Sequence, residues 1–97
     1  MIKIKYADNY LKRLIGLMFK KDIDYGLLFI LGYGSGIHTC FMRFNIDVYF
    51  IDENKIIFEK ITLKPWKYYN PSKKAKYILE TKENHMNLKK GDKIDFI

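Results

Sequence analysis

Residues 38–52, HTCFMRFNIDVYFID, hold several chemically active side chains within an apolar run. If this stretch is extended, His38, Cys40 and Met42 share one face, because alternate residues of a strand point the same way. Imidazole, thiolate and thioether groups are soft donors that suit Cu(I) or zinc. A closed zinc site takes four ligands, however, and the only other histidine is His85, far along the chain. We therefore expect no metal and no cofactor, and we interpret Cys40 as a small apolar core residue.

Asp47 is a carboxylate inside the apolar segment IDVYFI. Such a group must pair or hydrogen-bond, or lie at the mouth of its strand. Arg13 and Arg43 are the obvious charged partners, because guanidinium matches a carboxylate in two parallel hydrogen bonds. Together with His38, these three residues form a candidate site for a small polar ligand or a peptide. The alternative is a structural aspartate that pins the preceding loop.

Cys40 and His38 are also the residue types that a thiol nucleophile and its base require. Such a site needs an oxyanion hole as well, and the sequence offers no group in that role. The segment GYGSG, residues 32–36, lacks the spacing of a phosphate-binding loop and precedes an expected strand rather than a helix. No catalytic residue is assigned, and an enzyme ranks behind the two binding functions.

The second candidate binding region is the stretch 60–76, in which aromatic residues alternate with six lysines and no acidic residue occurs. Aromatic side chains beside lysines are how proteins hold single-stranded nucleic acid. The candidate polyanion-binding residues are Lys64, Trp66, Lys67, Tyr68, Lys73 and Lys74. The competing interpretation is a connector held by two prolines, whose aromatics pack inward while the lysine head groups stay in water. We favour this second interpretation, because lysine is abundant throughout this chain of net charge +7.

Length and composition limit the remaining possibilities. The chain of 97 residues is 48% hydrophobic and 16% aromatic, which predicts a single domain, 1–97, with a packed core. One cysteine excludes an internal disulfide and agrees with a reducing compartment. The start, MIKIKYADNY, lacks the apolar core of a signal peptide, and no apolar run is long enough to span a bilayer. We expect a cytoplasmic protein without membrane association; the sequence indicates no oligomeric state.

The elements that must position these residues are mainly strands. Asp8 is expected to cap a helix over residues 9–18, whose apolar residues fall on one stripe. Strands are expected at 2–6, 26–31, 37–44, 46–51, 56–63, 76–81 and 93–97. Residues 64–74 should form a loop and 82–87 one helical turn. The predicted fold is mostly β (α+β): a compact, partly closed antiparallel β-barrel of about seven short strands with one N-terminal helix.

Several short motifs follow one another along nearly the whole chain. They are Arg13 with Gly16-Leu17-Met18; Gly26-Leu27-Leu28-Phe29; Phe41-Met42 with Ile46-Asp47-Val48; Phe50-Ile51-Asp52; Tyr77-Ile78-Leu79-Glu80; and Gly91-Asp92. In order and spacing they resemble domain of unknown function family 192, also called uncharacterised protein family 127. The resemblance implies a small β-rich single domain found in bacteria and archaea, and it implies no established activity.

Carried over residue by residue, the resemblance draws attention to one set of positions. These are Arg13, Gly16, Met18, Gly26, Phe29, Met42, Asp47, Asp52, Glu80, Gly91 and Asp92. The chain departs from the pattern at Leu27, where members often have methionine, and at Asn45, where many have threonine or proline. Several bacterial members carry a cysteine pair that is missing here, so no redox role is transferred.

Overall fold

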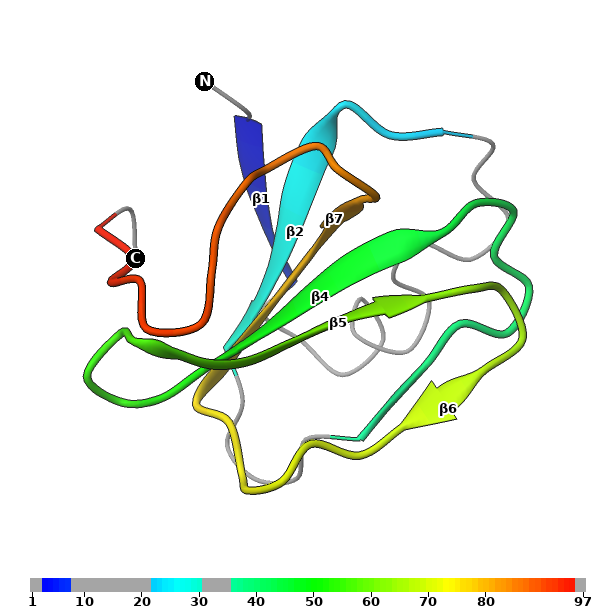
Figure 1. The fold of residues 1–97 in the computed structure, drawn as a ribbon. Coiled ribbons are helices and arrows are strands. Elements are labelled where there is room, and N and C mark those ends of the chain that lie inside the picture. The colour runs from blue at the N-terminus through cyan, green and yellow to red at the C-terminus, as the bar shows by residue number, and fades with distance from the viewer. Residues whose placement is uncertain (1–2, 8–21, 31–35, 96–97) are drawn as a thin grey trace.

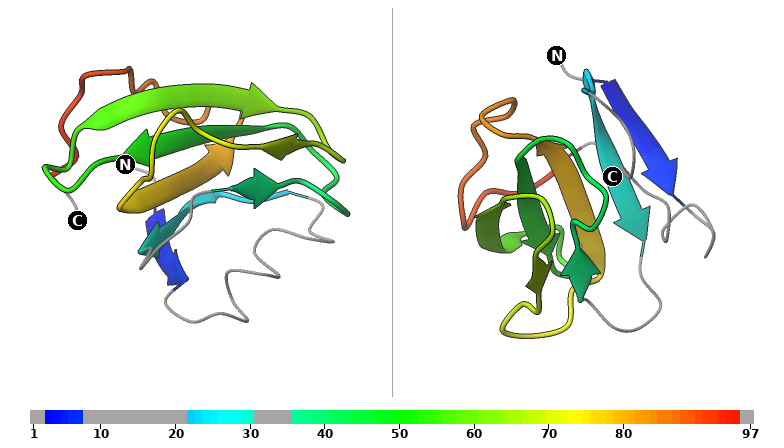
Figure 2. Two further views of the ribbon diagram at one scale, coloured as in Figure 1. Left: turned by 90° about the horizontal axis from the view of Figure 1, so that it is seen from below. Right: turned by 90° about the vertical axis from the view of Figure 1, so that its right-hand side faces the viewer.

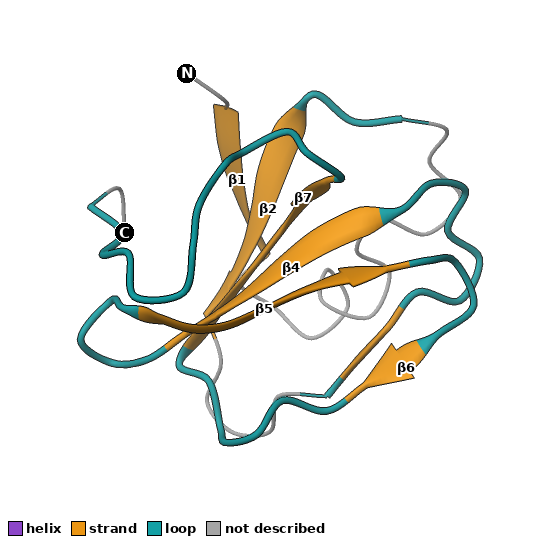
Figure 3. Ribbon diagram, in the orientation of Figure 1, coloured by secondary structure: helices purple, strands orange, loops and turns teal. Residues whose placement is uncertain are grey.

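The computed structural model describes residues 3–7, 22–30 and 36–95, and within them the secondary structure consists of strands and turns without a helix (Figure 3). The strands are β1 (Lys3–Ala7), β2 (Tyr25–Ile30), β3 (Ile37–His38), β4 (Ile46–Ile51), β5 (Ile57–Leu63), β6 (Tyr68–Tyr69) and β7 (Tyr77–Lys82). The mostly β class is therefore confirmed. The helix expected over residues 9–18 lies outside the described residues.

Five strands form one twisted sheet in the order β1-β2-β7-β4-β5, and β3 and β6 form a separate antiparallel pair (Figures 1 and 2). The sheet is open within the described residues, because β1 and β5 are its edges and do not pair with each other. The expected barrel is therefore wrong. The expectation of a purely antiparallel fold is also wrong, since β1 runs parallel to β2. Pairing partners far apart in the chain are set by packing, which local patterns do not encode.

Both faces of the large sheet are covered, which explains why every residue of β4 is buried. We call one side the small-sheet face, because Val48 of β4 and Ile78 of β7 belong to the same core as Ile37 of β3. We call the other side the C-terminal face, where the core of buried residues consists of Leu28, Tyr49, Ile51, Ile57, Leu79 and Ile94. Asp47 and Tyr49 alternate with Val48 and so belong to the C-terminal face.

The expected strand 37–44 is mostly a turn. Pairing stops after His38, and the amide of Met42 donates to the carbonyl of Thr39 at 3.1 Å, which closes a turn over residues 39–42. The predicted alternation of faces consequently fails: Thr39 is fully buried and Phe41 is exposed. Phe41 has a φ of 64°, the left-handed conformation that turns usually give to glycine or asparagine. An aromatic residue there gives no local turn signal.

Three further segments differ from expectation. The loop 64–74 contains the short strand β6. Of the helical turn expected over 82–87, Lys82 ends β7 and residues 83–86 form a turn and a bend. Of the last expected strand, the described residues 93–95 contribute a single bridge, between Lys93 and Ile56. No helix of the described residues is long and apolar enough to cross a membrane.

Candidate functional site

Asp47 is buried on β4, and both of its carboxylate oxygens accept hydrogen bonds. The hydroxyl of Thr62 donates to Oδ1 at 2.5 Å, and the backbone amide of Asn84 donates to Oδ2 at 2.9 Å. Asn84 has a φ of 63°, a left-handed conformation that asparagine tolerates in turns, and this bond fixes that turn to β4. The described residues thus satisfy Asp47 with a hydroxyl and an amide.

The structure separates the members of the candidate ligand set. Asp47 belongs to the C-terminal face, whereas His38 is half-buried in the small sheet, where it pairs with Tyr68. Arg43 is exposed just before β4, and Arg13 lies outside the described residues. Asp47 and His38 therefore do not converge. His38 instead accepts a hydrogen bond at Nδ1 from the amide of Cys40, at 3.2 Å. Within the described chain, no three or more His, Cys, Asp or Glu residues form a group that could hold a metal ion.

A different group of residues does converge, around Thr39. Its hydroxyl donates to the carbonyl of Lys64 at 2.6 Å and accepts from the amide of Lys67 at 2.8 Å. These are the first and fourth residues of the turn Lys64-Pro65-Trp66-Lys67, so the hydroxyl bridges the two groups that a β-turn often joins directly. The backbone of Thr39 contacts the same turn: its amide donates to Lys67 at 2.8 Å, and its carbonyl accepts from Trp66 at 2.9 Å.

The two turns that meet at Thr39 each carry an aromatic residue in the left-handed conformation. Phe41 and Trp66 both have φ values of 64°, although a bulky side chain makes this conformation costly. Their rings are in contact, with centroids 4.7 Å apart and planes at 59°. Phe41 is nevertheless 45% exposed and Trp66 61% exposed. The interpretation in which the aromatics of this loop pack inward is therefore wrong for Trp66.

Tyr68, on β6, is a third exposed aromatic residue close to Trp66 in the sequence. It is 67% exposed, and its hydroxyl bonds to Oδ1 of Asn70 at 3.2 Å. Gly36 leaves room for this arrangement, since a Cβ at that position would lie 2.5 Å from the Tyr68 hydroxyl oxygen. We call Phe41, Trp66 and Tyr68 the aromatic surface.

The lysines of the 60–76 stretch do not all flank the aromatic surface. Lys64 and Lys67 adjoin Trp66 in its turn, and both are exposed. Lys60 instead contacts the C-terminal face: its ammonium lies 5.2 Å from the centroid of the Tyr49 ring and donates to the carbonyl of Leu88 at 3.2 Å. The ammonium of Lys73 lies 4.7 Å from the centroid of the Phe58 ring. The stretch is therefore not one continuous basic face.

Glu59 anchors the loop that follows β6. One of its oxygens accepts from the Tyr69 hydroxyl, and the other accepts from the amide and hydroxyl of Ser72, at 2.8 and 2.9 Å. Partial burial raises the pKa of Glu59, but these hydrogen bonds outweigh burial, and the pKa is lowered overall. Glu59, which directly precedes the stretch 60–76 in the sequence, is thus engaged in hydrogen bonds within the domain.

Glu80, on the small-sheet face of β7, is a second buried carboxyl group among the described residues. Its register partners are Leu27 on β2 and Val48 on β4, both apolar. Burial raises the pKa of Glu80 to about 8. At neutral pH the folded protein therefore holds Glu80 mostly in its uncharged form.

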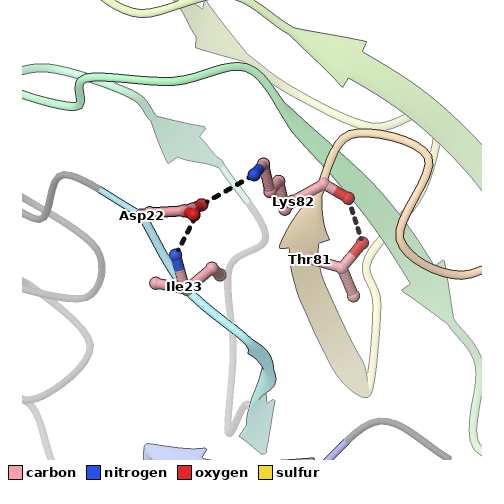
Figure 4. Close-up of polar contacts among 4 residues, drawn as sticks. All are labelled: Asp22, Ile23, Thr81 and Lys82. Carbon is pink, nitrogen blue, oxygen red and sulfur yellow. Dashed lines mark hydrogen bonds and ion pairs between the residues drawn. The ribbon is translucent and has the colours of Figure 1, made fainter.

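An ion pair joins the segment before β2 to the end of β7. The ammonium of Lys82 lies 2.9 Å from Oδ1 of Asp22, which also accepts from the amide of Ile23 (Figure 4). The bond from Lys82 and the amide of Ile23 lower the pKa of Asp22. Both charged side chains are largely exposed, and ion pairs of this kind contribute little to stability. We assign this pair a local structural role.

Sequence reasoning identified Trp66 and Tyr68 but missed Thr39 and Phe41. Pro65 is a usable signal for the second turn, because proline commonly precedes a residue with positive φ in a type II turn. Neither Thr39 nor Phe41 carries such a signal, because their roles depend on a contact between turns some 25 residues apart, as the bond from Thr39 to Lys64 illustrates.

The chain thus folds as a small, mostly β domain built on one open sheet. It belongs to the DUF192 family, described as Uncharacterized ACR, whose profile matches residues 1–96. It is 43% identical over 83 residues to the UPF0127 protein of Pyrococcus furiosus, covering 81% of this chain and 71% of that one. It is 37% identical over 101 residues to the UPF0127 protein of Thermococcus sibiricus, covering 97% of this chain and 66% of that one. The predicted family is therefore confirmed.

Two crystal structures share the fold. A protein of unknown function from Novosphingobium aromaticivorans superposes with a TM-score of 0.88 at 15% identity, covering 98% of this chain and 75% of that one. A proposed transcription regulator from Sinorhizobium meliloti 1021 has a TM-score of 0.75 at 20% identity, covering 84% of this chain and 69% of that one. At these identities the likeness concerns the fold alone.

Proposed function

We propose that this domain is a binding module that holds single-stranded nucleic acid on the aromatic surface. The observation that carries the proposal is the contact between Phe41 and Trp66, two exposed aromatic residues that both have positive φ. Strained backbone of this kind costs about 1–3 kcal/mol per residue and gathers at binding sites. Glycine would relieve the strain at both positions, so the aromatic rings are kept at the expense of stability.

Charge supports a polyanionic ligand. Lys64 and Lys67 flank Trp66, and residues 60–76 contain no acidic side chain. Any base presents a flat π-face to an exposed indole or phenol, and each stacked base contributes roughly 1–3 kcal/mol. The lysines would neutralise the phosphates between the stacked bases. We favour this function over a small polar ligand held by Arg13, His38, Arg43 and Asp47, because hydrogen bonds within the domain already occupy Asp47.

Titration with single-stranded DNA tests the proposal directly. Trp66 is the only tryptophan, so stacking on it should quench the intrinsic indole fluorescence. We expect micromolar or tighter affinity at physiological salt for an oligothymidylate of roughly 12 nucleotides, a length within the site sizes of such proteins. Trp66→Ala should weaken binding at least several-fold, measured by anisotropy of a labelled strand.

The salt dependence provides a matched control. Lys64→Ala and Lys67→Ala should each reduce the slope of log affinity against log salt by about 0.7, the value for one phosphate contact on a single strand. Lys60→Ala should leave the slope unchanged, because that ammonium contacts Tyr49 and Leu88 on the other face. Weak binding that is indifferent to Trp66 and equally sensitive to all three lysines would mean generic surface charge. Binding to anionic vesicles but not to DNA would point to a membrane surface instead.

A further inference from the structure

Every polar atom of Thr39 is used by the two turns that present the aromatic surface. The hydroxyl bonds to Lys64 and Lys67, the amide to Lys67, and the carbonyl to Trp66 and Met42. The side chain is fully buried, so water does not supply any of these bonds. One residue therefore closes both the 39–42 turn and the 64–67 turn.

These bonds explain how two strained residues persist side by side. A non-glycine residue stays at positive φ only where the surrounding structure determines it from several directions. Trp66 is held in two ways. Its own amide donates to the carbonyl of Thr39, and the hydroxyl of Thr39 bridges Lys64 and Lys67, the first and last residues of its turn. At Phe41 the corresponding constraint is the bond from Met42 to Thr39. Without the hydroxyl, the 64–67 turn loses its bridge, and Trp66 can relax to negative φ.

We propose that Thr39 is the positioning residue of the aromatic surface. Its hydroxyl group holds the turn of Trp66, and its backbone carbonyl holds the turn of Phe41, in the conformation that binds. Thr39 itself does not touch the ligand, since it is buried beneath the turns. Its effect on affinity comes from preorganisation: a surface already in its bound conformation loses less conformational freedom on binding. The part of this inference that concerns affinity for nucleic acid rests on the proposed function.

Two substitutions at Thr39 separate the effect of its hydroxyl from the effect of its size and so test the inference. Thr39→Val removes the hydroxyl, and Thr39→Ser retains it. Thr81→Val is the matched control, because Thr81 is also a fully buried threonine, on β7 (Figure 4). Its hydroxyl bonds to the neighbouring carbonyl of Lys82 at 3.1 Å and to Tyr49, and to neither of the two turns. Thr39→Val should weaken oligothymidylate binding by roughly tenfold or more through lost preorganisation. Thr39→Ser and Thr81→Val should bind within about threefold of the original protein, because the bridge remains.

A second readout needs no ligand. The contact between Phe41 and Trp66 should give the indole a fixed environment, visible in near-ultraviolet circular dichroism and in iodide quenching of Trp66 fluorescence. Thr39→Val should flatten the dichroism and change the quenching, whereas Thr81→Val should change neither. If Thr39→Val does not fold, Thr39→Cys, with its weak donor, should weaken binding relative to Thr39→Ser.

The outcomes separate the two proposals. A folded Thr39→Val protein with unchanged dichroism and unchanged affinity would overturn the role of Thr39 while leaving the nucleic-acid function intact. Failure of the original protein to bind DNA would overturn the function, and the ligand-free spectra would still decide whether Thr39 positions the two rings. Equal losses in Thr39→Val and Thr81→Val would mean that general destabilisation, not positioning, is responsible.

Discussion

The hydroxyl of Thr62 on β5 donates to Oδ1 of Asp47 on β4 at 2.5 Å, between two residues that face each other in the strand register. The same carboxylate accepts from the amide of Asn84. Asp47 therefore joins the edge strand of the large sheet to the turn that follows β7. Removing the carboxylate of Asp47 would leave these two donors without their acceptor.

Asp47→Ala should lower the free energy of unfolding by about 1–3 kcal/mol, because the Thr62 hydroxyl and the Asn84 amide both lose a charged acceptor. Urea denaturation followed by circular dichroism measures the change. Thr62→Val should cost less, since the carboxylate keeps the Asn84 bond, and the double variant should lose less than the sum of the single losses. A loss within about half a kcal/mol for Asp47→Ala would be typical of a surface residue and would contradict this role.

Glu80 makes stability depend on pH in the opposite sense from most carboxylates. Burial raises its pKa to about 8 in the folded protein, from an ordinary value of 4.5. Between these two values the unfolded chain binds fewer protons, so the stabilising contribution of the neutral acid is lost as pH rises, at up to roughly 1.4 kcal/mol per pH unit. Below the lower value the contribution is fully present.

Glu80→Gln should flatten this dependence, because the amide is uncharged and nearly the same shape. Urea denaturation of both proteins at several pH values across this window should give curves that diverge toward the alkaline end, with the glutamine variant the more stable there. Parallel curves for the two proteins would show that Glu80 is ionised in the folded state throughout.

Trp66→Gly should be more stable than Trp66→Ala by about 1 kcal/mol, because glycine adopts positive φ without steric cost. Both variants lack the indole and should lose nucleic-acid binding equally. Tyr68 supplies the control: it lies in β6 and is not among the residues with positive φ, so its glycine variant should be the less stable one, by about 0.5–1 kcal/mol. Thermal denaturation of Trp66→Gly, Trp66→Ala, Tyr68→Gly and Tyr68→Ala measures which variant of each pair is the more stable.

Tyr49→Phe should lower the free energy of unfolding by about 1 kcal/mol through loss of its bond to the carbonyl of Met86, at 2.8 Å. Desolvation, reinforced by the charge of Asp47, raises the pKa of Tyr49 to about 12. The original protein should consequently lose stability as pH rises from about 10 toward 12, whereas the phenylalanine variant should not lose this contribution. Alkaline denaturation curves that coincide would contradict the assignment.

The strands that the sequence predicts well are those with continuous apolar runs. β4 begins and ends at the expected residues, 46 and 51, because both of its faces are buried and its residues are apolar apart from Asp47. The edges of the fold were harder to predict. The parallel partner of β2 and the two-residue strands β3 and β6 depend on contacts distant in sequence, and Phe41 places a turn where propensity favours a strand.

The candidate site shows the same division between local and distant information. The composition of residues 60–76 drew attention to Trp66 and Tyr68, but composition does not distinguish an exposed indole from a buried one. That difference depends on the positive φ at Trp66, which the contact with Thr39 maintains. The chemistry of Asp47 draws attention to its site, while its partners among the described residues, Thr62 and Asn84, are polar groups that no charge pattern indicates.

The order of strands in the large sheet also determines when a growing chain can fold. β7 is the last of the five strands to leave the ribosome, yet it lies at the centre of the sheet, between β2 and β4. Of the large sheet, a nascent chain that ends before Tyr77 holds only the pairs β1–β2 and β4–β5, and isolated two-stranded sheets are marginal in water. Leu28 meets Leu79 only after the long intervening segment has closed. Synthesis of β7 should therefore trigger a single cooperative folding step, and until then the open edges of β2 and β4 need protection from aggregation.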